Sequence, residues 1–169
     1  MFVLGIDPGL SRCGYGCVES NGRGGRATAV GVLTTAPSDP LPKRLATLDQ
    51  ELRALLADLR PDAVAVERLF FQVNARTAMA VGQASGLVLA AAAQANCQVA
   101  QYTPNEVKQA VAGYGSAPKE QVQRMVQALL NLPERPRPPD AADALAVALC
   151  HLAMAPLWAR LDRAPGVAR

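Results

Sequence analysis

Four acidic residues stand where apolar segments of the sequence begin or end. Asp7 closes the run FVLGID and is followed at once by a Pro-Gly pair. Glu67 closes a second run, AVAVE, while Asp140 and Asp143 open a long apolar segment, DAADALAVALCH. A single acid in such a place is commonly a surface charge that ends a strand or opens a helix. Four of them can form a shared site if the fold brings them together.

The chemistry of such a site would be the binding of hard divalent cations. Carboxylates gathered in a partly dry pocket repel one another, so they must spread apart, take up protons or hold cations. All-oxygen ligands suit Mg²⁺ or Mn²⁺, and two such ions about 4 Å apart catalyse displacement at phosphorus. One ion activates a water and the other stabilises the departing 3′ oxygen. We expect Asp7 to bridge the two ions, and Glu67, Asp140 and Asp143 to complete their coordination.

The apolar pattern predicts the elements that must position these acids. Strands are expected over residues 2–7, 13–19, 27–35, 63–71 and 98–103. Helices are expected over residues 45–59, 75–95, 104–112, a segment after Ser116 as a possible N-cap, and a last segment from Pro139 to about Ala155. Three strands joined by short turns and then alternating helices and strands are typical of an α/β fold with a mixed sheet and helices on both faces.

In this arrangement the first, fourth and fifth strands are parallel, because helices cross between them. Ligands of such sheets gather beyond the carboxyl ends of the parallel strands, where Asp7 and Glu67 lie. Asp140 and Asp143 are three residues apart and therefore share one face of their helix. If that helix lies on the sheet, its acidic first turn can complete the site.

Length and composition favour a single compact domain. The chain has 169 residues, half of them apolar, and we expect one domain over residues 1–156 followed by a flexible tail over residues 157–169. Its four cysteines form no C-x-x-C pair, which favours buried thiols in a reducing compartment over a zinc site. Neither a signal peptide nor a membrane span is apparent, so we expect a cytoplasmic protein.

The charge of the chain permits an anionic partner without requiring one. The net charge is +3 and the isoelectric point is about 8.8, slightly below the value of about 9 that marks obvious nucleic-acid-binding domains. Two of the few lysines, Lys108 and Lys119, lie on either side of the loop GYGSAP. The alternative interpretation is that both are solvated lysines on helix surfaces.

Four blocks of the sequence resemble the bacterial Holliday-junction resolvases of the RuvC family, whose fold is RNase H-like. The blocks are LGIDPGLSRCGYG, VERLFFQVNARTAMAVGQASG, NEVKQAVAGYGSAPKEQVQRMV and DAADALAVALCH. The resemblance implies a five-stranded mixed sheet of order 3-2-1-4-5 and an endonuclease that cuts two strands symmetrically and leaves 5′ phosphates. It assigns catalysis and metal binding to Asp7, Glu67, Asp140 and Asp143, with Mg²⁺ or Mn²⁺ as cofactor. It also implies a homodimer, four-way junction DNA as substrate and the RuvA–RuvB branch-migration complex as partner.

The resemblance further implies a set of DNA contacts. These are Phe70, Asn74, Arg76, Lys108 and Lys119. An exposed aromatic at Phe70 would stack on bases near the crossover, although Phe70 and Phe71 are also plausible core residues. Part of the Ala- and Gly-rich helix over residues 75–94 is expected to form the dimer contact.

Three other functions are compatible with parts of this pattern. The first is another metal-dependent nuclease of RNase H-like fold that acts on different DNA or RNA substrates. The second is an ATP-using enzyme of the actin and sugar-kinase class, but such enzymes need two lobes and have no use for the D-x-x-D helix. The third is a non-catalytic binding module, which would not need all four acids.

Overall fold

The computed structural model describes residues 1–20, 25–68 and 75–161, with the side chains of residues 75–77 and 156–161 left aside. Its strands are β1 (Phe2–Asp7), β2 (Arg12–Ser20), β3 (Gly25–Thr34), β4 (Ala63–Glu67) and β5 (Gln98–Tyr102). Its helices are α1 (Leu41–Leu59), α2 (Ala75–Gln94), α3 (Pro104–Ala112), α4 (Lys119–Leu129) and α5 (Pro139–Leu161). The element types and their order along the chain agree with the sequence-based prediction.

The five strands form one mixed sheet in the order β3-β2-β1-β4-β5. The three N-terminal strands pair antiparallel, whereas β4 pairs parallel with β1 and with β5. Both the order and the directions confirm the prediction. The parallel strands β1 and β4 therefore end at the same edge of the sheet.

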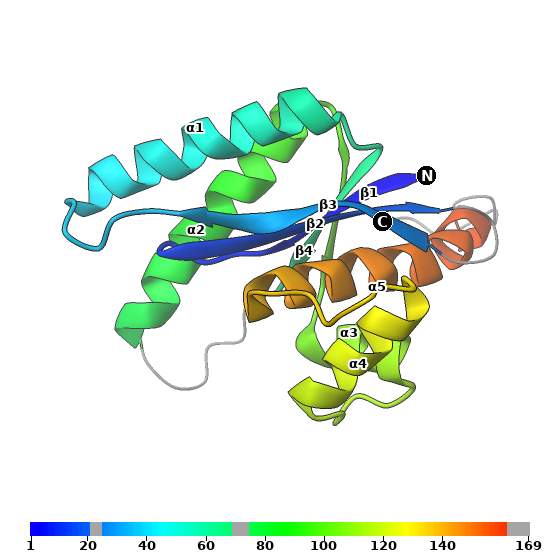
Figure 1. The fold of residues 1–169 in the computed structure, drawn as a ribbon. Helices are drawn as coiled ribbons and strands as arrows, with labels where there is room; N and C mark the ends of the chain where they lie inside the picture. Colours follow the sequence, from blue (N-terminus) through cyan, green and yellow to red (C-terminus); the bar gives the residue numbers. More distant parts are fainter. Residues whose placement is uncertain (21–24, 69–74, 162–169) are drawn as a thin grey trace.

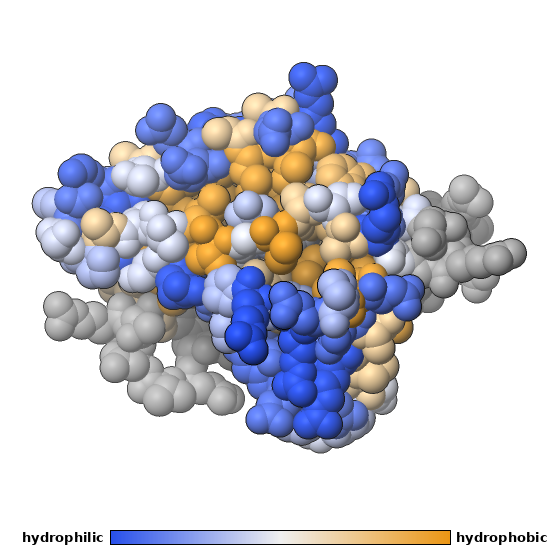
Figure 2. Space-filling model, viewed as in Figure 1, coloured by the Kyte–Doolittle hydropathy of each residue, from blue (hydrophilic) through white to orange (hydrophobic). Residues whose placement is uncertain are grey.

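Helices cover both faces of this sheet, so the molecule has three layers. In Figure 1, α1 and α2 lie on one face, and α5 lies on the other with α3 and α4 beyond it. On the surface shown in Figure 2, hydrophobic residues gather across the middle of the molecule and hydrophilic residues cover the region of α4. None of the helices in the described part of the chain has the length and apolar character needed to cross a membrane.

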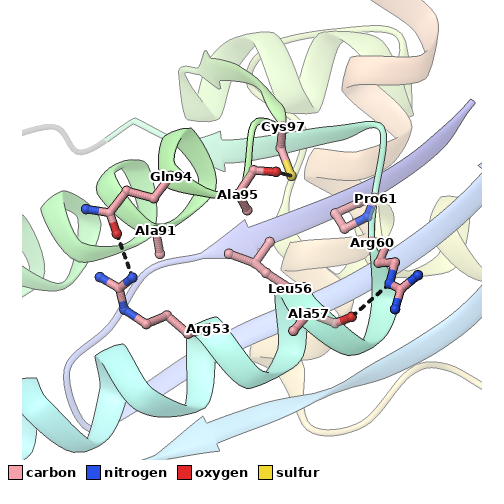
Figure 3. Close-up of a pocket in the computed structure, with 9 residues that line it drawn as sticks. All are labelled: Arg53, Leu56, Ala57, Arg60, Pro61, Ala91, Gln94, Ala95 and Cys97. Atoms are coloured by element: carbon pink, nitrogen blue, oxygen red, sulfur yellow. Dashed lines mark hydrogen bonds between the residues drawn. The ribbon is translucent and has the colours of Figure 1, made fainter.

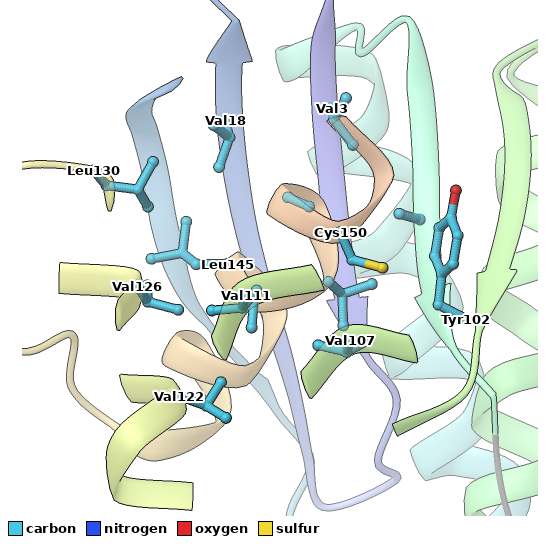
Figure 4. Close-up of a cluster of buried hydrophobic side chains, with 14 of the residues drawn as sticks. Val3, Val18, Tyr102, Val107, Val111, Val122, Val126, Leu130, Leu145 and Cys150 are labelled. Atoms are coloured by element: carbon cyan, nitrogen blue, oxygen red, sulfur yellow. The ribbon is translucent and has the colours of Figure 1, made fainter. Parts of the chain in front are cut away.

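The side chains of β1 alternate between two hydrophobic clusters, one on each face. Leu4 and Ile6 join the cluster beneath α1 and α2, while Val3 joins the cluster beneath α5. Figure 4 shows members of the second cluster from the sheet and from α3, α4 and α5, among them Val3, Val107, Val122 and Leu145. Because successive side chains of a strand point to opposite faces, the odd-numbered residues of β1 face α5 and the even-numbered residues face α1 and α2.

Free cysteines contribute to both clusters. Cys13 and Cys17 are buried beneath α1 and α2, and Cys150 is buried beneath α5. Cys97, at the start of the β5 segment, is only partly buried. The interpretation as buried small hydrophobes is therefore confirmed for three thiols and is only partly right for Cys97.

Glycines in β1 and β2 bring α5 unusually close to the sheet. A Cβ atom added at Gly5 would collide with the backbone oxygen of Ala144, and one added at Gly14 would collide with the backbone oxygen of Asp140. At Gly16 the added atom would lie 2.7 Å from Cγ of Leu145. The absence of side chains at these positions therefore sets the distance between the first turns of α5 and the ends of β1 and β2.

Gly14→Ala is expected to displace the first turn of α5 and to damage both stability and activity. The new methyl group meets backbone, which cannot rotate away, so the free energy of unfolding should fall by about 1–3 kcal/mol. Because Asp140 moves with that turn, DNA cleavage should fall about 100-fold. Thermal unfolding and single-turnover cleavage measure the two effects. Unchanged stability and unchanged cleavage in Gly14→Ala would contradict the argument.

Several element boundaries differ from the prediction. Helix α1 begins at Leu41 rather than residue 45, because Pro42 lies in its first turn, where a proline is tolerated. Strand β4 ends at Glu67 rather than residue 71, although the Arg68 amide still donates to the carbonyl of Tyr102 in β5, and residues 69–71 lie outside the described part. Helix α4 begins at Lys119 with Pro118 as its N-cap residue, so Ser116 is not the cap. Helix α5 continues to Leu161 and not to about Ala155, so it passes through Pro156, a residue type that commonly ends a helix. Residues 157–161 are thus helical, and residues 162–169 lie outside the described part.

Candidate active site

Asp7 and Glu67 are the last residues of β1 and β4, which run side by side. Ile6 pairs with Val66 in the parallel register, so the two acids follow at the same edge. In β4, as in β1, alternate residues point to alternate faces, and Ala63 and Ala65 lie in the cluster beneath α5. Glu67 follows Ala65 by two residues, and Asp7 follows Val3 by four, so both acidic side chains lie on the face covered by α5.

Burial beside other acids raises the pKa of Asp7 to about 8. Loss of solvent is the largest cause, and the charges of Glu67, Asp143 and Asp140 add to it. The pKa of Glu67 is also raised, first by burial and then by the charge of Asp143, although a hydrogen bond with Asp7 acts in the opposite direction. The two acids therefore form a hydrogen-bonded pair that favours sharing a proton over carrying two negative charges.

Asp140 and Asp143 lie at the start of α5, three residues apart as the sequence indicated. The contact between Gly14 and the Asp140 backbone places this turn beside β1, because Gly14 pairs with Asp7 in the sheet. Burial raises the pKa of Asp143, opposed by Lys119 and reinforced by Asp140. The structure thus brings all four acids into one region, where the charges of the other three act on Asp7.

Two lysines line the same region. Lys119, the first residue of α4, places Nζ 2.5 Å from Oδ2 of Asp143. Burial opposes its protonation, but the hydrogen bond and the charge of Asp143 outweigh that cost, so the pKa of Lys119 is raised. Lys108 of α3 lines, with Lys119, Glu67 and Asp143, a pocket of about 250 Å³. Two positive side chains therefore border the acids on the side of α3 and α4.

The sequence-based prediction missed Arg12, which pairs with one of the four acids. Its Nε lies 2.8 Å from Oδ2 of Asp140. The connection after Asp7 is a tight turn, so the chain re-enters the sheet at Arg12 on the edge where β1 ends. A charged residue at the start of the second strand was the signal that could have identified it.

A hydrogen-bond network holds this turn against α1. The hydroxyl of buried Thr35 donates to the carbonyl of Leu10 at 2.6 Å and accepts from Nε of Arg44 at 2.9 Å. Nη2 of Arg44 also donates to the hydroxyl of Ser11 at 2.5 Å. The backbone beside Arg12 is thereby fixed on the side of the turn that faces away from the acids.

The remaining predicted DNA contacts lie beyond what the structure describes. Phe70 and Asn74 fall in residues 69–74, outside the described part of the chain. Arg76 belongs to the first turn of α2, and its side chain is not among those described. These three assignments remain predictions from the resemblance.

The carboxylate oxygens of the four acids suit a hard divalent cation, although they are not arranged around a common point as ligands of a metal ion would be. Among residues 1–20, 25–68 and 75–161, no three acids, histidines or cysteines have the arrangement of such a site. Arg12 and Lys119 pair with the acids of α5, and Asp7 and Glu67 pair with each other. Carboxylates whose pKa values are raised by mutual repulsion are nevertheless the groups that gain most from a dication.

A larger hollow lies away from the acids, between the C-terminal parts of α1 and α2. It measures about 600 Å³, and Figure 3 shows Arg53 and Gln94 joined by a hydrogen bond across it. Its lining contains none of the four acids and neither of the two site lysines. We therefore place the chemistry at the sheet edge.

Comparisons with known proteins show which family this chain resembles. The model of the family described as "Crossover junction endodeoxyribonuclease RuvC" matches residues 3–151. A relative of that name from Moorella thermoacetica is 54% identical over 96% of this chain and 97% of its own. The structure of Thermus thermophilus RuvC is 43% identical, with a TM-score of 0.87 over 94% of this chain and 97% of that one. A second Thermus thermophilus RuvC structure, in complex with a Holliday junction substrate, has a TM-score of 0.88 at 42% identity over 94% of this chain and 96% of that one.

Proposed function

The chain belongs to the RuvC family of crossover junction endodeoxyribonucleases, and from this premise we propose that it resolves Holliday junctions during recombination and DNA repair. The reaction is metal-dependent hydrolysis of two phosphodiester bonds in strands of like polarity. The observation that carries the proposal is the convergence of four carboxylates from β1, β4 and α5 at one edge of the sheet, bordered by basic side chains.

The four acids would bind the metal ions from two sides. Asp7 and Glu67 approach from the sheet and Asp140 and Asp143 from α5, so their oxygens can surround a pair of Mg²⁺ or Mn²⁺ ions. Such ions, when bound, supply an activated water and stabilise the charge on phosphorus and on the leaving 3′ oxygen. The burial of Asp7 excludes water from one side of the reaction centre, which strengthens every charge interaction there.

The basic residues hold the DNA backbone over the acids. Lys108 and Lys119 border the small pocket that also contains Glu67 and Asp143, so a phosphate drawn to either ammonium lies near the reaction centre. Phe70 would stack on a base near the crossover, and Asn74 and Arg76 would contact the adjoining backbone. The lysines position the DNA strand, and the acids act on the phosphodiester bond that this places beside them.

Paired cleavage follows from a homodimer whose two sites are related by a two-fold axis. A four-way junction has the same approximate symmetry, so each protomer can cut one of two equivalent strands. We assign part of the dimer contact to α2, whose sequence is rich in Ala and Gly and whose Met79 is largely exposed. We expect the protein to act in the cytoplasm with the RuvA–RuvB branch-migration complex.

Incubation with a synthetic four-way junction tests this function. With Mn²⁺ the protein should make two symmetrically placed nicks with 5′ phosphates, and a ligase should reseal each product. No cleavage is expected in EDTA or on a linear duplex that contains the same sequence. A matched RNA duplex should also remain uncut; faster cleavage of that RNA than of the junction would favour another RNase H-like nuclease.

A further inference from the structure

Arg12 holds one of the four acids in a way that bears on metal binding. Its Nε lies 2.8 Å from Oδ2 of Asp140. A divalent ion bound to that carboxylate would lie about 2.1 Å from an oxygen and would repel the guanidinium beside it. Arg12 and a divalent ion therefore compete for Asp140.

We propose that Arg12 is a counter-ion for Asp140 that leaves the carboxylate when a divalent ion binds and then pairs with a phosphate of the DNA. This inference rests on the proposed function, because it requires both the metal and the DNA backbone. It makes metal loading and substrate binding mutually dependent. By linkage, the metal must raise the affinity for DNA by the same factor by which DNA raises the affinity for the metal.

The ion pair is exposed enough to open. The side chain of Arg12 is 50% exposed and that of Asp140 is 30% exposed, so water screens their attraction. The second pair, between Lys119 and Asp143, is shorter, and its acid is only 21% exposed. Arg12 is thus the cation that a competing ion displaces more readily.

Only the side chain of Arg12 needs to move. Its backbone pairs with Thr34 in the sheet, and the preceding turn is fixed through Ser11 and Arg44. Within the described part of the chain Arg12 has no second acid as a partner. A guanidinium released from Asp140 therefore meets solvent or an incoming anion.

A DNA phosphate is the anion that suits this position. The scissile strand must pass over the acids, so phosphates of the same strand come within reach of Arg12, whose side chain begins at the start of β2, on the edge where β1 ends. The planar guanidinium binds phosphate oxygens through two parallel hydrogen bonds, which an ammonium cannot do. Arg12 thereby exchanges the Asp140 carboxylate for a DNA phosphate, which also offers two oxygens to the guanidinium.

Titration of the DNA-free protein with Mn²⁺ in a calorimeter tests the first half of the proposal. Arg12→Gln removes the competitor and should bind Mn²⁺ about two- to five-fold more tightly than the unaltered protein. Arg12→Lys keeps the charge and should stay near the unaltered value. Arg26→Gln is the matched control, since Arg26 pairs with Glu19 at 2.9 Å near the opposite end of the sheet and should leave Mn²⁺ affinity unchanged.

Salt dependence of junction binding, measured with Ca²⁺ in place of Mn²⁺, tests the second half. Loss of one phosphate contact should lower the slope of log affinity against log salt by about one in Arg12→Gln and not in Arg26→Gln. An unchanged slope overturns the exchange onto phosphate.

The calorimetric outcomes separate this inference from the proposed function. If the unaltered protein binds no Mn²⁺, both fail. If it binds Mn²⁺ and Arg12→Gln binds equally or more weakly, the competition is overturned while the proposed function stands. Thermal unfolding of each variant confirms that it is folded, and Arg12→Ala, which also removes the charge, supplies the same comparison should Arg12→Gln unfold.

Discussion

Asp7→Asn is expected to abolish strand cleavage and to leave junction binding intact. The substitution removes the carboxylate that we assign to both ions, while the amide keeps the size and hydrogen-bonding capacity of the side chain. Loss of this ligand should lower the single-turnover rate at least about 1000-fold, more than the 10- to 100-fold cost of disturbing a residue that merely supports a ligand. Junction affinity, measured by gel shift in EDTA, should stay within about two-fold, because Lys108 and Lys119 are unaltered.

The matched control for this prediction is Asp49→Asn. Asp49 accepts a hydrogen bond from Arg53 at 2.7 Å on the surface of α1, away from the site. This variant should cleave at the unaltered rate. Cleavage by Asp7→Asn at that same rate would show that catalysis lies elsewhere, and loss of junction binding by Asp7→Asn would show that Asp7 serves the substrate.

The metal-free protein should lose stability as the pH rises from about 4 to 8, and Asp7 should account for much of the loss. Burial beside other acids raises the pKa of Asp7 from 3.8 to about 8 in the folded state. The folded chain therefore binds a proton that the unfolded chain has released, so the stabilisation present below pH 4 disappears as the pH passes through 8. A shift of this size corresponds to about 2–5 kcal/mol of unfolding free energy.

Urea denaturation in EDTA between pH 5 and pH 9 measures this effect. Asp7→Asn cannot ionise, so at pH 8 it should be more stable than the unaltered protein, and the difference should shrink toward pH 5. Addition of Mn²⁺ at pH 8 should stabilise the unaltered protein, because a dication replaces the missing proton. Asp49→Asn should follow the unaltered protein throughout; equal pH dependence in Asp7→Asn would contradict the assignment.

The opposite effects expected of Asp7→Asn on activity and on metal-free stability have one cause. The site gathers acids that repel one another, and that repulsion is the reason for its affinity for cations. In the DNA-free structure the strain is relieved by Arg12, by Lys119 and by the pairing of Asp7 with Glu67. A divalent ion would compete with these partners for the same oxygens.

Much of the fold was accessible from local patterns. Apolar runs ended by Asp7 and Glu67 marked two strands, and the helices between them required those strands to be parallel. The order of the sheet came from the resemblance to a known family. The helix boundaries were less accurate: the start of α1 and the end of α5 were wrong by several residues and the N-cap of α4 by two, since caps and chain ends depend on neighbours outside the helix.

The identity of the four acids and the helical spacing of Asp140 and Asp143 can be read from the order of residues, because strand and helix periodicities act over a few positions. The depth at which α5 sits is different, since it depends on glycines in β1 and β2 that meet a helix more than 120 residues later. The partnership of Arg12 with Asp140 and the raised pKa of Asp7 arise from the same close approach. Short-range pattern therefore identified the acids that we propose as catalytic groups, whereas charge and proximity, which act through space between distant segments, set their ionisation and their partners.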